Sequence, residues 1–188
     1  MKLASHNSWS FGRPQRWWMR IFQPFSKCQD LDIREQFHAG VRMFDLRLKK
    51  YRNAMYTSHG MVVYGSPSQD IVVLNNLAQT WGKHVYVRVL LESRFPSPEE
   101  VHMFRDYCEW LERRFAWITF FGGHGAHGDI WYLSFYRFSG KVPTPFENHC
   151  SIASGFHPIP YLYARKHNRK HNPEESPNVF LMQDFIQY

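Results

Sequence analysis

Two histidines with small or polar neighbours lie on either side of an Asp-x-Arg pair in the first third of the chain. His6 lies in the run SHNS and His59 in the run SHG, and between them the strand-like run VRMFDLRL holds Asp45 and Arg47. Because side chains two residues apart in a strand share a face, this carboxylate and this guanidinium project together. Taken singly, each feature also fits a structural role, as a strand-end ion pair or a core histidine. Together they suit phosphodiester chemistry, with one imidazole as base, the other as acid, and an arginine offsetting charge on phosphorus oxygens.

The elements that must position these side chains alternate between strand-like and helical patterns. Apolar runs typical of strands occur at Val41–Leu48, Met61–Tyr64, His84–Leu91, Trp117–Phe121, Ile130–Phe138 and Val179–Ile186. Helical patterns lie between several of them, at Ile33–Ala39 after an Asp30 cap, at Gln69–Trp81, and at Pro98–Phe115 after a Ser97 cap. This alternation predicts a mainly parallel sheet covered by helices.

Such a sheet is either a doubly wound open sheet or a closed barrel. A (β/α)8 barrel usually needs about 250 residues, so a chain of 188 residues would need several helices to be short or missing. No glycine-rich phosphate loop follows the first strand, which weakens the nucleotide-binding open-sheet alternative.

The composition indicates one domain that spans residues 1–188. Lys and Arg number 23 against 16 Asp and Glu, a formal net charge of +7, and 44% of residues are hydrophobic. The basic excess favours an acidic partner, which charge alone leaves open among nucleic acid, anionic lipid and a phosphorylated substrate. No apolar run approaches the roughly 20 residues of a membrane span, and residues 1–9 do not resemble a secretory signal, which favours the cytoplasm without excluding export. The three cysteines are expected to be buried thiols, Cys28, Cys108 and Cys150.

Six motifs in order carry a resemblance to a known family. They are SHNSW (5–9), IREQ (33–36) leading into GVRMFDLRL (40–48), SHG (58–60), VRVLLE (87–92), YRFSG (136–140) and LMQDFI (181–186). This set resembles the X domain of phosphatidylinositol-specific phospholipase C, most closely the single-domain bacterial type, from residue 3 to residue 186. The resemblance implies a compact, distorted TIM (β/α)8 barrel with its active site at the carboxyl ends of the strands.

The resemblance also implies a role for each catalytic residue. His6 is similar to the general base that takes the proton from the inositol 2-hydroxyl, and Asp184 to the carboxylate that orients it. Arg47 resembles the arginine that stabilises the phosphorane-like transition state. His59 resembles the general acid for the leaving diacylglycerol oxygen, held by Asp45.

Substrate contacts follow the resemblance less closely. Asn7 stands where bacterial members often have Asp, and its role is either to assist the acid or to hold the phosphate. Glu92 stands where they have Lys, and Arg137 resembles an arginine that binds sugar hydroxyls. Tyr161 or Tyr163 resembles the aromatic segment that lines the mouth, although core packing fits either tyrosine equally well.

We expect no metal cofactor, because calcium-dependent members have a carboxylate at the position of Arg47, and in bacterial members the guanidinium occupies the space of the cation. The alternative is a Ca²⁺ or Mg²⁺ site, since three oxygen-bearing residues match calcium-ligand positions, namely Asn7, Asp45 and Glu92.

A basic, aromatic segment follows the first motif. Residues 10–25 combine three arginines with adjacent Trp17 and Trp18, a mixture that suits the headgroup region of an anionic membrane. In the resembling bacterial enzymes a short helix just after the first histidine touches the membrane. Packing of both indoles against the barrel is the alternative.

These observations predict an enzyme that cleaves phosphatidylinositol or a related phospholipid through a cyclic phosphate. One alternative is a metal-dependent phosphodiesterase that acts on a glycerophosphodiester or sphingolipid head group. Another is an anionic-lipid-binding barrel without turnover, which would need neither a base nor an acid. Nucleic acid is not the expected partner, and the sequence does not predict an oligomeric state.

Overall fold

The computed structural model of the chain describes residues 2–126, 133–141, 146–150, 158–168 and 179–188. Its strands are β1 (Lys2–Ser5), β2 (Val41–Tyr51), β3 (Ala54–His59), β4 (Val62–Val63), β5 (Val85–Leu91), β6 (Ile118–Gly125), β7 (Phe146–Asn148) and β8 (Phe180–Gln183). Its helices are a 3-10 turn, η1 (Trp17–Ile21), and α1 (Gln23–Ser26), α2 (Ile33–His38), α3 (Ser68–Thr80), α4 (Pro98–Arg114) and α5 (Pro160–His167).

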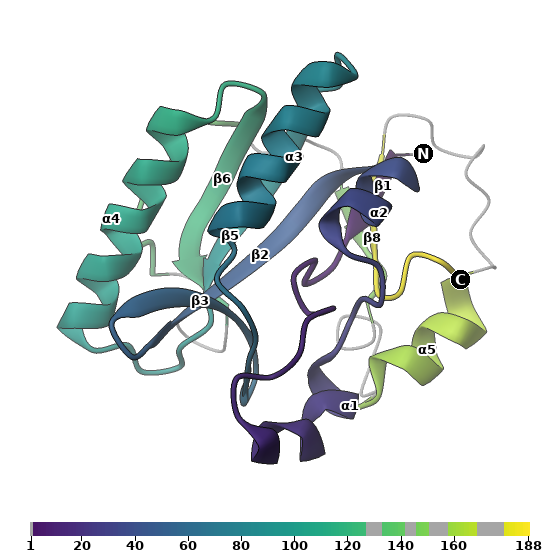
Figure 1. Cartoon of the computed structure of the whole chain (residues 1–188), viewed down its shortest axis with the longest axis horizontal. Helices are drawn as coiled ribbons and strands as arrows, with labels where there is room; N and C mark the ends of the chain where they lie inside the picture. The colour runs from purple at the N-terminus through teal and green to yellow at the C-terminus, as the bar shows by residue number, and fades with distance from the viewer. Residues whose placement is uncertain (1, 127–132, 142–145, 151–157, 169–178) are drawn as a thin grey trace.

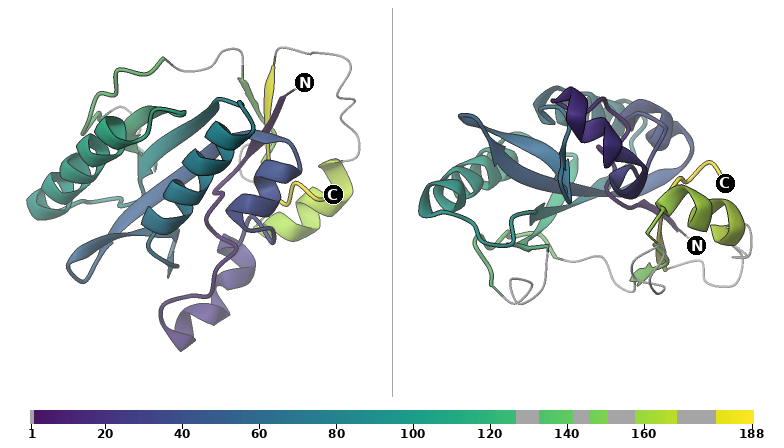
Figure 2. Two further views of the ribbon diagram at one scale, coloured as in Figure 1. Left: turned by 45° about the horizontal axis from the view of Figure 1, so that its top comes forward. Right: turned by 90° about the horizontal axis from the view of Figure 1, so that it is seen from below.

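A mainly parallel sheet forms the centre of the molecule, as the alternation of patterns predicts. The strands β7, β8, β1, β2, β5 and β6 pair in that order, and every pairing among them is parallel. Beyond β2, the strands β3 and β4 add an antiparallel extension. Helices α3 and α4 pack on one face of β2, β5 and β6 (Figures 1 and 2).

The two faces of β2 differ in the way that strand alternation requires. Phe44, Leu46 and Leu48 are buried in the main apolar cluster, together with residues of α2, α3 and α4. Met43, on the other face, belongs to a second cluster with residues of β1, β6 and β8. Asp45 and Arg47 share the face of Met43, so the polar residues of the strand project away from the covering helices.

Local capping fixes where two of the helices begin. The Asp32 side chain accepts from the Glu35 N–H and the Glu35 side chain accepts from the Asp32 N–H, which makes a capping box at the start of α2. The predicted Asp30 cap was therefore wrong, and Asp30 pairs with Lys27 instead. The predicted cap of α4 is confirmed, since Ser97 accepts from the backbone N–H of Glu100.

The predicted closed barrel is not what the described residues form. Within those ranges β6 and β7 are not paired, so the sheet stays open between them. After β6 the chain turns back: Phe135 and Tyr136 donate backbone N–H groups to the Gly123 carbonyl, and Ser134 bridges antiparallel to His124. A Cβ atom at Gly123 would collide with the Tyr136 carbonyl, so this close return needs glycine.

Three further expectations concern one strand, the cysteines and membrane spans. The predicted strand Ile130–Phe138 lies partly outside the described residues, and its described part is this antiparallel return rather than a parallel strand. All three cysteines are buried free thiols, as predicted. Across the described ranges, no helix has both the length and the apolar character to span a bilayer.

Candidate active site

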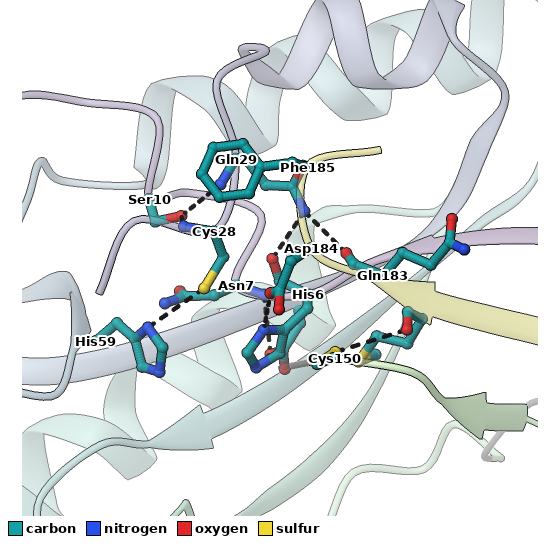
Figure 3. Close-up of polar contacts among 12 residues, drawn as sticks. His6, Asn7, Ser10, Cys28, Gln29, His59, Cys150, Gln183, Asp184 and Phe185 are labelled. Carbon is teal, nitrogen blue, oxygen red and sulfur yellow. Dashed lines mark hydrogen bonds and ion pairs between the residues drawn. The ribbon is translucent and has the colours of Figure 1, made fainter. Parts of the chain in front are cut away.

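Five of the residues predicted from the sequence meet where the parallel strands end. His6 follows β1, Asp184 follows β8, and His59 is the last residue of β3. Asp45 and Arg47 lie in β2 on the face that points away from α3 and α4. Figure 3 shows the two histidines and Asp184 pointing toward one another, with the ring centroids of His6 and His59 5.5 Å apart.

Hydrogen bonds on both ring nitrogens fix the orientation of His6. Its Nδ1 lies 2.6 Å from an Asp184 carboxylate oxygen, and its Nε2 lies 2.7 Å from Nη2 of Arg47. Because a guanidinium can only donate, Nε2 is assigned as the acceptor, and the ring proton then lies on Nδ1 and is donated to Asp184. In this assignment the Nε2 lone pair of His6 faces Arg47.

Asp45 accepts three hydrogen bonds within the site. It is fully buried, and its carboxylate accepts from Arg88 at 2.7 Å, from Arg47 at 3.0 Å and from the backbone N–H of Asn7 at 3.1 Å. Burial alone would raise the pKa of Asp45, but Arg88 and then Arg47 more than offset it and hold the pKa well below its usual range. Asp45 is therefore ionised and neutralised by two cations.

Arg88 is a site residue that sequence reasoning missed. It is buried in β5, directly beside Asp45 in the parallel register of β2 and β5. The available signal was an arginine in the middle of the apolar run VYVRVLL, since a charged side chain inside a covered strand requires an internal partner.

His59 is not held by Asp45, contrary to what the resemblance implied, because both Asp45 oxygens already bond to other groups. The Nδ1 of His59 lies 2.8 Å from the backbone carbonyl of Ser26 and 3.5 Å from the Cys28 sulfur. A carbonyl only accepts, so Nδ1 carries the proton and Nε2 does not. Burial, followed by the positive charge of Arg47, lowers the pKa of His59 to about 4.

Arg47 also fills the space between the carboxylates of the alternative metal site. It bonds to Asp45 and approaches Glu92 at 3.4 Å, and the other Glu92 oxygen accepts the backbone N–H of Gly60 at 2.9 Å. Asn7 is adjacent, with its backbone N–H donated to Asp45. The oxygen set of Asn7, Asp45 and Glu92 does not fit a hard divalent ion while Arg47 lies between the carboxylates.

Two predicted substrate-binding residues lie outside this cluster. Arg137 is exposed on the antiparallel return, where neighbouring Tyr136 donates to Glu112 of α4. Tyr163 is buried in α5 and stacks on His167 at 4.5 Å. The alternative tyrosine, Tyr161, contacts the Phe185 ring at 5.5 Å, one residue beyond Asp184.

The predicted membrane segment is exposed rather than packed in the core. Trp17 is 78% exposed and Trp18 40%, while Met19 anchors η1 in a small buried cluster with β4. Ile21 and Phe25 add exposed apolar surface on the same short stretch. The alternative of both indoles packing against the sheet is not observed.

The described residues form a mixed α/β fold with the candidate site beside the ends of its parallel strands. No family model and no curated protein matches the sequence. Among solved structures, phosphatidylinositol-specific phospholipase C from Listeria monocytogenes is similar over 98% of this chain and 87% of its own, with a TM-score of 0.65 at 14% identity. The Staphylococcus aureus enzyme is similar over 100% of this chain and 86% of its own, with a TM-score of 0.62 at 16% identity. The resemblance to bacterial phosphatidylinositol-specific phospholipase C is thus confirmed in the fold.

The low pKa of His59 has a direct spectroscopic test. We expect NMR titration of the unmodified protein to show His59 neutral at pH 6 and protonating near pH 4, because burial and Arg47 disfavour the imidazolium. In Arg47→Met the pKa should rise but stay below 6.5, since burial remains. The unfolded chain protonates His59 near 6.5, so this histidine lowers the stability of the fold as pH falls from 6.5 toward 4. Protonation of His59 at or above pH 6.5 in the free protein would contradict this geometry.

Proposed function

We propose that the protein cleaves the phosphodiester bond of phosphatidylinositol, or of a related phospholipid with a hydroxyl next to the phosphate, by intramolecular attack. The proposal rests on a hydrogen-bonded row of three side chains, Asp184, His6 and Arg47. Asp184 lies 2.6 Å from one nitrogen of the His6 ring, and Arg47 lies 2.7 Å from the other. This row joins His6, a base with an unprotonated ring nitrogen, to Arg47, a cation suited to a phosphate oxygen. The names of the structural neighbours point to the same reaction.

Substrate binding would release the base. A non-bridging phosphate oxygen is a stronger acceptor for Arg47 than an imidazole, because it carries charge and allows two parallel donors. Once Arg47 bonds to the phosphate, the Nε2 lone pair of His6 is free to take the proton of the attacking hydroxyl. Asp184 then stabilises the imidazolium through the Nδ1 proton.

His59 would act on the other side of phosphorus. It is neutral in the free protein, and an anionic phosphodiester beside it favours the protonated form and raises its pKa. The proton that it gains on Nε2 goes to the leaving diacylglycerol oxygen, and a cyclic phosphate remains. Ser26 keeps the ring turned for this transfer by holding Nδ1.

The buried amide of Asn7 supplies a further donor for phosphate. Its Nδ2 is buried without a hydrogen-bond partner among the described residues, and the backbone is in the left-handed region at φ 43°. A buried donor in this state costs free energy unless a ligand satisfies it. We therefore assign Asn7 to holding the phosphate rather than to assisting His59. In the same proposal the guanidinium of Arg47 takes the place of a metal cofactor.

We also propose that the face carrying η1 and α1 docks on an anionic membrane. Trp17, Ile21 and Phe25 are exposed there beside Arg13, Arg16 and Arg20. The segment lies at the lower edge of the molecule in Figure 1, and the carbonyl of Ser26, the last residue of α1, accepts from His59 of the site. The S. aureus neighbour binds membranes. An edge-on approach would present the site to the phosphodiester of a lipid.

A substrate with a better leaving group distinguishes the proposed roles of His6 and His59. His59→Ala should lose about 10²–10⁴ in the rate of phosphatidylinositol cleavage and recover most of it on a nitrophenyl phosphodiester of inositol, whose leaving oxygen needs no proton. His6→Ala should lose a similar factor on both substrates, because the nucleophile still needs a base. His102→Ala, an exposed histidine of α4, is the matched control. Equal recovery of both site variants would rule out the assignment of base and acid.

The membrane face is tested with vesicles that contain phosphatidylglycerol. Trp17→Ala combined with Ile21→Ala should weaken sedimentation with these vesicles about tenfold or more, because each buried apolar side chain is worth roughly 1.5–3 kcal/mol. Turnover of a soluble substrate should change little. Trp81→Ala is the control, since Trp81 is 58% exposed at the opposite end of the molecule, where α3 ends (Figure 1). Unchanged vesicle binding in the double variant, or an equal loss in the control, would argue against this face.

A further inference from the structure

A thiol lies in the catalytic cluster without a part in the chemistry proposed above. The Cys28 sulfur, a ring nitrogen of His6 and a carboxylate oxygen of Asp184 all lie within 4.8 Å of one another, and all three residues are buried. Figure 3 shows the Cys28 side chain directed into the space between the two histidines. Burial, and then the Asp184 charge, raise the pKa of the thiol well above its usual value, so Cys28 is not a nucleophile here.

The backbone around these three residues is fixed by hydrogen bonds. The N–H of Cys28 donates to the Ser10 hydroxyl at 2.8 Å, and its carbonyl accepts the N–H of Phe185, next to Asp184, at 2.6 Å. The Gln29 side chain donates to the carbonyls of His6 and Gln183 at 3.0 Å each, which ties the ends of β1 and β8 together. Outer contacts of this kind hold metal ligands in place before a metal ion binds.

Sulfur, imidazole nitrogen and carboxylate oxygen together form a donor set that suits zinc. Zn²⁺ takes all three in tetrahedral sites, often with a fourth position left for water or another ligand. Ca²⁺ and Mg²⁺ prefer oxygen ligands alone and do not favour a thiolate. We propose that His6, Cys28 and Asp184 form a zinc site, and that zinc bound there holds the enzyme inactive.

The inactivation, which rests on the function proposed above, follows from what the ion occupies. Zinc forms one bond to the Cys28 sulfur, whose proton is released to solvent, one to a ring nitrogen of His6, and one to an oxygen of Asp184. With one ring nitrogen on the ion and the other carrying the ring proton, His6 has no lone pair left to act as a base. The ion also replaces the bond between His6 and Asp184 that would stabilise the imidazolium.

Cobalt(II) tests the site independently of activity, because a cysteine thiolate bound to it gives an intense near-ultraviolet charge-transfer band. The unmodified protein should show this band, and Zn²⁺ should abolish it by displacement. Cys108→Ala, which removes a buried thiol on α4, should keep the band as the matched control. Cys28→Ser should lose it, and so should His6→Ala, which keeps the assay decisive if one variant fails to fold. No band in the unmodified protein, or a band that persists in a folded Cys28→Ser protein, would overturn the site.

Inhibition is measured separately on phosphatidylinositol cleavage. Zn²⁺ should inhibit the unmodified protein and Cys108→Ala, while Cys28→Ser should need at least about tenfold more Zn²⁺ relative to its own uninhibited rate. Mg²⁺ and Ca²⁺ at equal concentration should leave all three rates unchanged. Undiminished cleavage with the zinc site saturated would overturn the inactivation. Absence of cleavage in every sample would refute the proposed function, and the cobalt band would still decide the site.

Discussion

The burial of the Asp45 carboxylate is the constraint on which the rest of the site depends. A carboxylate with no exposed surface is costly unless it is paired, and removal of one partner of such a pair typically costs about 3–5 kcal/mol. Arg88 and Arg47 neutralise it from β5 and β2, and the N–H of Asn7 ties it to the turn after β1. That turn carries His6. The Asp45 carboxylate therefore positions both the Arg47 guanidinium and the His6 imidazole that Arg47 contacts.

The two histidines differ because their partners differ in charge. His6 donates to the Asp184 carboxylate, whereas His59 donates to the neutral Ser26 carbonyl beside Arg47, and the pKa of His59 is low. In the proposed mechanism, an anionic substrate would supply the charge that His59 needs in order to become an acid.

Much of the fold followed from the sequence because its strands are continuous apolar runs and α4 carries strong capping signals. The predicted patterns were found as β2, β4, β5, β6, β8, α2, α3 and α4. The closed barrel was wrong, because alternation alone does not reveal that the chain folds back antiparallel at Gly123. The meeting of His6, Asp45, Arg47, His59 and Asp184 was expected from motif order. The partners of Asp45 and His59 were not expected. The partner of Asp45 depends on the register of β5, and the partner of His59 is a backbone carbonyl, and neither leaves a periodic signal in the sequence.

Phosphorus NMR of phosphatidylinositol vesicles treated with the protein, with and without EDTA, tests the central claim most directly: that a guanidinium held by Asp45, and not a metal ion, activates the phosphate for attack by a neighbouring hydroxyl. We expect a cyclic phosphodiester resonance to grow at the same rate in both samples. A first product that is acyclic, or a reaction that EDTA stops and added Ca²⁺ or Mg²⁺ restores, would contradict it.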